Sequence, residues 1–190
     1  MTKSQSFRFK RFEVWHDLCA MKVGTDGVLL GAWCPITSNL PHRVLDIGTG
    51  SGLIALMLAQ RLSGKDTYSI DAIDIDSSAI VQAKKNFALS PWHDHLHAHQ
   101  YALQDWNPDG VLYDLIVSNP PFFVNSLKNP NAARTMARHT DSISFEELIC
   151  HSSRLLSEKG IFALILPYEH KQVILSLAHA HRLYPYSITD

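Results

Sequence analysis

The sequence predicts an α/β protein whose core is a doubly wound, mostly parallel β-sheet. Short apolar segments typical of buried strands alternate along the chain with segments whose apolar residues recur every three or four positions, as on one face of a helix. Alternation of this kind requires crossover connections, which place parallel strands in one sheet with helices on both of its faces. The expected strands are residues 43–48, 68–75, 96–101, 113–118 and 160–167.

Four helices are expected between and after these strands, and two of them begin with a capping signal. Asp76 precedes one helix as a candidate N-cap. Ser144 precedes another and is followed three residues later by Glu147, which is the spacing of a capping box. The expected helices are residues 53–62, 77–89, 144–156 and 169–181.

Length and composition fit one soluble globular domain. The chain has 190 residues, of which 46% are hydrophobic and 18% are charged, and its formal net charge is −1. No apolar run approaches the ~20 residues that a membrane helix needs, and the N-terminus lacks the apolar core of a signal peptide. The cysteines are odd in number and form no CxxC pair, which indicates a reducing, cytoplasmic setting. They are Cys19, Cys34 and Cys150.

The N-terminal segment, residues 1–12, carries basic and aromatic side chains but no acid. Two interpretations stay open. These side chains contact RNA phosphates and stack on bases, or they form a solvated, partly disordered terminus. The residues concerned are Lys3, Arg8, Lys10 and Arg11, with Phe7, Phe9 and Phe12 between them.

A glycine-rich loop, "DIGTGSG", connects the first expected strand to the first helix that follows it. A dinucleotide-binding G-x-G-x-x-G pattern would need glycine where Leu53 stands. The pattern instead resembles motif I of class I S-adenosylmethionine-dependent methyltransferases. Glycines let a cofactor pass close over the backbone, and an acidic loop suits a cationic cofactor that has no pyrophosphate. The loop residues of this pattern are Asp46, Gly48, Thr49, Gly50 and Gly52; the Asp46 carboxylate either organises the loop or faces an amine.

A second acidic signal stands at the end of the second expected strand, in "AIDID". Asp74 lies where a carboxylate accepts hydrogen bonds from both ribose hydroxyls of a nucleoside cofactor. We place Ile75, which follows it, in the same cofactor site. Together with the glycine loop, this acid predicts a nucleoside cofactor.

The fourth expected strand runs directly into Asn119-Pro120-Pro121-Phe122. This sequence resembles the (D/N/S)-P-P-(Y/F) motif of methyltransferases that modify a planar nitrogen. Such a nitrogen is a poor nucleophile because its lone pair is delocalised. The Asn119 side-chain oxygen and the Pro120 carbonyl can accept both N–H protons, which orients the lone pair and stabilises developing positive charge. The prolines keep the acceptors rigid, and Phe122 stacks on the substrate plane.

Longer segments resemble the bacterial tRNA adenine-N6 methyltransferases that act beside the anticodon of a valine tRNA. They are residues 16–35, 44–61, 90–96 and 118–123. The resemblance implies S-adenosylmethionine as cofactor, tRNA as substrate and adenine 37 as target. It divides the chain into a basic extension with a cofactor-covering helix, residues 1–40, and a methyltransferase core, residues 41–190.

The segment "MKVGTDGVLLGAW" is the most distinctive part of this resemblance. It implies that Lys22, Gly24, Thr25 and Asp26 lie near the amino-acid end of the cofactor. From the residues alone, Thr25 and Asp26 could instead cap a helix. That helix would bury Val28, Leu29 and Trp33.

The chain departs from the family pattern in two ways. Family members usually have an acid after the third strand that meets the cofactor's adenine amine, but Ala102 stands at that position. We assign the role to Asp105, three residues later. The family also runs on for roughly two further strands, so we expect the sheet of this chain to lack its last strands.

Other functions share parts of this pattern. Ribosomal-RNA guanine-N2 methyltransferases use the same acceptor chemistry, and glutamine-N5 protein methyltransferases use the same motif but carry an N-terminal helical domain. DNA adenine methyltransferases usually need a target-recognition region for which this chain has no room. A non-catalytic module that binds S-adenosylmethionine or RNA would have no need of Asn119.

Two basic clusters have less specific interpretations. Arg134, Arg138 and His139 follow the N-P-P-F motif and either contact RNA phosphate or form an ordinary basic loop. Histidines recur at every second position from His93 to His99, which would place them on one face of a strand and suggest a metal site. The preceding "SPWHDH" resembles a loop, so we expect histidines that face solvent and no metal.

Overall fold

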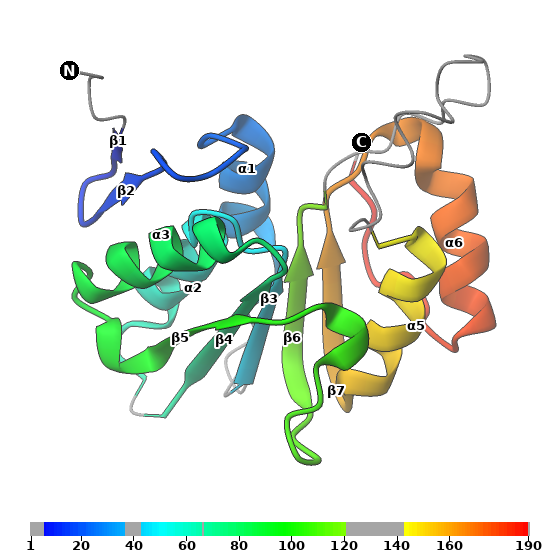
Figure 1. Ribbon diagram of the computed structural model, residues 1–190. Helices are drawn as coiled ribbons and strands as arrows, with labels where there is room; N and C mark the ends of the chain where they lie inside the picture. The colour runs from blue at the N-terminus through cyan, green and yellow to red at the C-terminus, as the bar shows by residue number, and fades with distance from the viewer. Residues whose placement is uncertain (1–5, 37–42, 66, 121–142, 190) are drawn as a thin grey trace.

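The computed structural model describes residues 6–36, 43–65, 67–120 and 143–189. Its centre is a five-stranded sheet with the order β5-β4-β3-β6-β7, in which every neighbouring pair is parallel (Figure 1). The predicted doubly wound parallel sheet is therefore confirmed. The strands are β3 (Arg43–Ile47), β4 (Ser69–Asp74), β5 (Leu96–Gln100), β6 (Tyr113–Ser118) and β7 (Leu156–Leu164).

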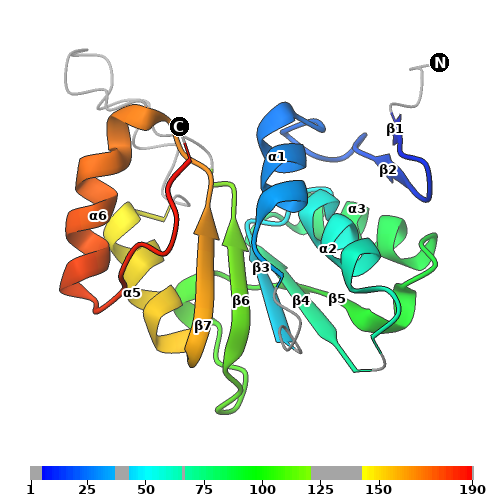
Figure 2. The ribbon, with the colours of Figure 1, turned by 180° about the vertical axis from the view of Figure 1, so that it is seen from behind.

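Helices cover both faces of the sheet, as crossover connections require. On one face Val44, Ile70 and Leu115 share a core with helices α1, α2 and α3. On the other face Leu45 and Ile116 pack with Leu148 of α5. Figure 2 shows α5 and α6 on one side of the sheet and α1, α2 and α3 on the other. The helices are α1 (Thr25–Trp33), α2 (Leu53–Leu62), α3 (Ser77–Ala88), α5 (Phe145–Leu155) and α6 (Lys171–Ala180). Short 3-10 turns are η1 (His93–His95), η2 (Leu103–Asp105) and η3 (Tyr168–His170). In the described ranges no helix is long and apolar enough to span a bilayer.

Both capping predictions are confirmed. The Asp76 side chain accepts a hydrogen bond from the Ser78 backbone N–H at 2.8 Å and so begins α3. Ser144 and Glu147 form a complete capping box at the start of α5. These contacts involve residues three or fewer positions apart, so local sequence determines them.

The last strand begins earlier than expected, because it follows α5 without a loop. Its register shifts between Tyr113, which pairs with Leu156, and Leu115, which pairs with Ile161. Gly160 lies at this irregularity, where a Cβ atom would come within 2.7 Å of the Tyr113 carbonyl oxygen. Regular pairing therefore starts at Ile161, one residue from the predicted start of the strand.

The N-terminal segment folds as an antiparallel hairpin of β1 (Ser6–Arg8) and β2 (Glu13–Trp15). Phe12 is buried; its ring stacks on Phe9 with 4.5 Å between centroids and meets Trp92 edge-on at 5.7 Å. The idea of a disordered terminus is therefore wrong for these residues. Stacking of Phe12 on a base is excluded as well, because the core already holds its ring.

Helix α1 packs through two glycines and Leu30, whereas its other large apolar side chains are less buried. Its buried residues are Gly27, Leu30 and Gly31. A Cβ atom at Gly31 would lie 2.7 Å from the Met57 sulfur of α2, so glycine permits the close approach of the two helices.

The expectation that this helix buries Val28, Leu29 and Trp33 is wrong for two of them. Val28 is half-buried, whereas Leu29 is 48% exposed and Trp33 68% exposed. Thr25 and Asp26 do not cap the helix either, because Gly24 is its N-cap and no side chain accepts a capping bond there.

Candidate functional site

Three of the predicted site segments meet at the carboxyl ends of neighbouring strands. In the sheet register Ile47 of β3 lies opposite both Ile73 of β4 and Ser118 of β6. The glycine loop begins directly after Ile47, Asn119 directly follows Ser118, and Asp74 is the last residue of β4. The chain order reverses between β3 and β6, which is where ligands bind in open α/β sheets.

The backbone of the glycine loop is fixed by hydrogen bonds to β4. The N–H groups of Gly48 and Thr49 both donate to the Ile73 carbonyl, at 2.9 and 3.0 Å. Gly48 and Gly50 adopt φ values of +70° and +54°, and no atom lies within 4 Å of where their Cβ atoms would stand. This open space beside the backbone fits the close passage of a cofactor.

Gly52, the last glycine of the loop, is needed for a different reason. Its φ of +80° lies in the left-handed region, and a Cβ atom would come within 2.5 Å of the Phe87 ring of α3. Glycine therefore permits both the turn into α2 and the close contact with α3.

Asp46 is fully buried beneath this loop and makes organising contacts. One carboxylate oxygen accepts hydrogen bonds from the Thr49 hydroxyl at 2.7 Å and from the Ala55 N–H at 3.2 Å. The other oxygen has no hydrogen-bond partner among the described residues. Burial raises the pKa of this carboxyl to about 7, although the bonds from Thr49 and Ala55 oppose the shift.

The Asp74 carboxylate connects the glycine loop to the end of β4. One oxygen accepts from the Gly50 N–H at 2.9 Å and the other from the Asp76 N–H at 3.0 Å. Burial raises the pKa of Asp74. Ile75 beside it is 44% exposed, so the end of this strand is accessible.

Asn119 extends from the end of β6 toward α1. Its side-chain oxygen is buried and has no hydrogen-bond partner within the described ranges. Its side-chain nitrogen lies 3.9 Å from where a Cβ atom of Gly27 would stand. Pro120 is buried. Pro121, Phe122, Arg134, Arg138 and His139 lie outside the described residues, so their predicted roles remain predictions.

The remaining predicted cofactor residues lie on two segments. Gly24 and Thr25 begin α1 and are exposed, Lys22 precedes them, and Asp26 is half-buried in the first turn. Because Gly27 of the same helix faces Asn119, these residues belong to the same edge of the sheet (Figure 1).

Asp105 is exposed at the end of η2. In the described part of the chain its carboxylate has no hydrogen bond to the glycine loop. The assignment of Asp105 to the cofactor site therefore remains a prediction.

Comparisons with known proteins show which proteins this chain is similar to. The family model described as "Methyltransferase small domain" matches residues 34–173. A tRNA1(Val) (adenine(37)-N6)-methyltransferase of Parabacteroides distasonis is 51% identical over 180 residues, which cover 94% of this chain and 73% of that protein. One of the same description from Aeromonas salmonicida is 48% identical and covers 97% of this chain and 75% of its own length.

The chain belongs to this methyltransferase family. Solved structures show the same fold at lower sequence identity. A T. thermophilus 16S rRNA N2 methyltransferase in complex with AdoMet and guanosine has a TM-score of 0.61 at 19% identity, with 92% of this chain and 45% of that chain covered. TrmN from Thermus thermophilus has a TM-score of 0.58 at 22% identity, with 84% and 41% covered.

Asn86 of α3 is a structural member of the site that the sequence interpretation missed. It is 1% exposed, and its side-chain nitrogen donates to the carbonyls of Trp15 at 2.8 Å and Ser51 at 2.7 Å. Its oxygen accepts from the Trp15 N–H at 3.0 Å. One amide thus joins the N-terminal hairpin to the glycine loop. The signal that could have identified it was a polar residue on the apolar stripe of α3 that contains Ala83 and Phe87.

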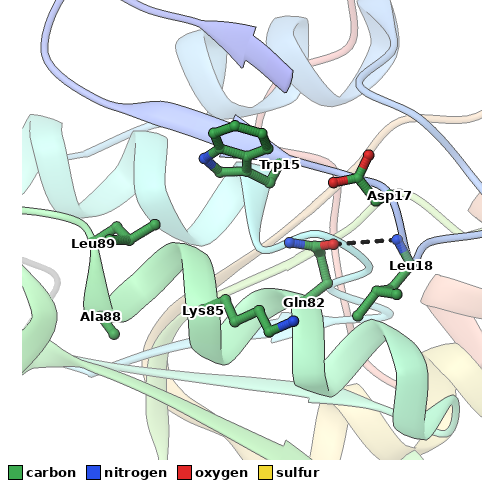
Figure 3. A pocket seen from close by; sticks show the side chains of 7 residues that line it. All are labelled: Trp15, Asp17, Leu18, Gln82, Lys85, Ala88 and Leu89. Atoms are coloured by element: carbon green, nitrogen blue, oxygen red, sulfur yellow. Dashed lines mark hydrogen bonds between the residues drawn. The ribbon is translucent and has the colours of Figure 1, made fainter. Parts of the chain in front are cut away.

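A groove of about 530 Å³ lies on the side of α3 that faces the hairpin (Figure 3). It contains none of the predicted site residues. In this groove Gln82 accepts a hydrogen bond from the Leu18 N–H at 3.2 Å, a second tie between α3 and the N-terminal segment. The lining residues are Trp15, Asp17, Leu18, Gln82, Lys85, Ala88 and Leu89.

The alternating histidines make separate contacts. His95 stacks on Tyr68 with 4.0 Å between ring centroids, and His99 lies 3.3 Å from the Asp71 carboxylate. His97 is exposed. Within the residues that the structure describes, no three His, Cys, Asp or Glu side chains are grouped to hold a metal ion.

Replacing Asp46 with Asn should change how stability depends on pH. The folded protein holds this carboxyl with a pKa near 7, above its ordinary value of about 4, so folding favours the protonated form. Its contribution to stability is fully present below about pH 4 and diminishes as the pH rises through about 7. Urea unfolding of the cofactor-free protein should show wild type losing stability relative to Asp46→Asn across this range. Parallel pH profiles would contradict the assignment.

Replacing Asn86 with Ala should weaken cofactor binding as well as folding. Three backbone groups lose their partner. The buried one, the Ser51 carbonyl, does so at a cost of about 1–3 kcal/mol. The substitution Gln82→Ala is the control, because it removes a tie to the hairpin but none to the glycine loop. Calorimetry should show at least about tenfold weaker S-adenosylmethionine binding for Asn86→Ala only. Wild-type cofactor affinity in Asn86→Ala would exclude a role in positioning the loop.

Proposed function

We propose that the chain transfers a methyl group from S-adenosylmethionine to the N6 amine of an adenine in tRNA, at position 37 of the valine tRNA named for its relatives. The observation that carries this proposal is the Asn119 side-chain oxygen. This oxygen is buried without a hydrogen-bond partner among the described residues. Asn119 directly follows Ser118, which pairs with Ile47, the residue that precedes the glycine loop.

Asn119 and Pro120 supply the acceptors for the substrate amine. The lone pair of the adenine N6 amine is delocalised into the ring. Two acceptors that take both N–H protons turn the lone pair out of the ring plane, and they stabilise the positive charge that develops on nitrogen. The proton can leave after transfer, so no strong general base is needed. Pro121 and Phe122 complete the motif by stiffening the acceptors and stacking on the base.

The glycine loop and its neighbours hold the cofactor, which supplies an electrophilic methyl group on a sulfonium ion. Gly48 and Gly50 leave open space for it beside the backbone. Asp74 is positioned to accept from ribose hydroxyls, and Asp46 keeps the loop in place. The first turn of α1 covers the amino-acid end. The further residues of this proposed site are Lys22, Gly24, Thr25, Asp26, Thr49, Gly52, Ile75 and Asp105.

The substrate must present an unstacked base. Asn119 lies at the carboxyl end of a buried strand. An adenine inside a duplex could not reach it without leaving its stack. A nucleotide in an anticodon loop is already exposed. We also propose a cytoplasmic location, where a tRNA substrate is available.

Replacing Asn119 with Ala should strongly reduce turnover and leave cofactor binding intact. Removing one acceptor that acts in the transition state costs about 10²–10³ in kcat. Labelled S-adenosylmethionine and tRNA from a strain that lacks the gene report turnover, and calorimetry reports cofactor affinity. Asn107→Ala is the matched control, because Asn107 also precedes a proline but is exposed on a loop. Full activity in Asn119→Ala would refute the assignment.

A further inference from the structure

The N-terminal hairpin presents three exposed cations and one acid, Glu13, which lies opposite Arg8 in the strand pairing. Arg8, Lys10 and Arg11 are exposed, and none of them forms an ion pair with another described residue. The nearby acid Glu13 accepts a hydrogen bond from the Ser6 hydroxyl at 2.6 Å. Because the whole chain has a net charge of −1, this concentration of positive charge is local.

These cations stand on a fixed surface. Asn86 and Gln82 hold the backbone of the segment at Trp15 and Leu18, with bonds of 2.8 to 3.2 Å. At the turn of the hairpin, Phe12 packs against Trp92, and the Arg11 guanidinium lies 5.8 Å from the centre of the same ring. The apolar side chains hold the hairpin down, and the charged ones remain in solvent.

The hairpin lies at the same edge of the molecule as the proposed site. Figure 1 shows β1, β2 and α1 at the edge toward which β6 and β7 point. Residues 16–24 connect β2 directly to α1, whose Gly27 faces Asn119. Beside the hairpin, the groove adds the exposed Lys85 to the same side of α3 (Figure 3).

We propose that Arg8, Lys10, Arg11 and Lys85 form a docking surface for the phosphodiester backbone of the RNA substrate. This inference rests on the proposed function, because it names how the same substrate is held. Phosphate contacts fix the orientation of a nucleic acid without reading its sequence, and structured RNA is recognised largely through shape and phosphates. A hairpin fixed at the same edge of the molecule as the site would orient the tRNA so that its anticodon loop reaches Asn119.

The test is a triple substitution, Arg8→Gln, Lys10→Gln and Arg11→Gln. We expect the KM for tRNA to rise about tenfold or more while kcat and the affinity for S-adenosylmethionine stay at wild-type values. The slope of log Kd against log salt concentration should become shallower by about one for each phosphate that the variant no longer neutralises.

The matched control removes three cations from the opposite edge of the sheet, where strands begin. It combines Arg43→Gln, Arg154→Gln and Lys159→Gln, all at exposed positions. Equal KM values and salt slopes for the two triple variants would overturn the docking surface. A Lys-for-Arg version, Arg8→Lys with Arg11→Lys, should keep most of the affinity because it keeps the charge.

Binding is also measured by fluorescence anisotropy with Asn119→Ala protein, so that the docking surface is tested without turnover. If wild type methylates no tRNA but the hairpin substitutions still weaken tRNA binding, the proposed reaction fails and the surface stands. If wild type methylates tRNA and the hairpin substitutions change neither KM nor Kd, the surface fails and the reaction stands. A surface that prefers anionic lipid vesicles to tRNA would also overturn the proposal.

Discussion

The register of β3 with its two neighbours is the constraint on which the rest of the site depends. Ile47 lies opposite Ile73 on one side and Ser118 on the other, and the Ser118 hydroxyl donates to the Ile47 carbonyl at 2.9 Å. Since parallel strands end at the same edge, this row brings the glycine loop, Asp74 and Asn119 together. A slip of one residue in either pairing would separate the cofactor loop from the substrate acceptor.

Buried polar groups then hold the irregular backbone that follows this row. Asp46 fixes the loop from below, and Asp74 fixes it from β4. Asn86 joins it to the N-terminal hairpin. Two glycines of α1 let that helix lie close to α2. This packing places the first turn of α1 beside Asn119. In this arrangement the cofactor loop, the covering helix and the hairpin are parts of one hydrogen-bonded and close-packed unit.

The sequence predicted what local patterns determine. Strand and helix periodicity, the Asp76 cap and the Ser144 capping box depend on residues close in the chain, and the glycine loop is a contiguous motif. The buried face of α1 could not be predicted, because Gly27 and Gly31 are covered by residues of α2 and, for Gly27, by Asn119, all far away in the sequence. The role of Asn86 was hidden for the same reason: its partners lie 35 and 71 positions away.

The arrangement at the end of β6 is proposed to methylate an adenine amine. The most direct measurement is the identity of the product nucleoside after reaction with labelled S-adenosylmethionine, tRNA and ribosomal RNA, followed by complete digestion and chromatography. The account predicts label in N6-methyladenosine from tRNA alone. Label in N2-methylguanosine would contradict it, because the two acceptors would then hold a different base, and label in ribosomal RNA would contradict the tRNA substrate.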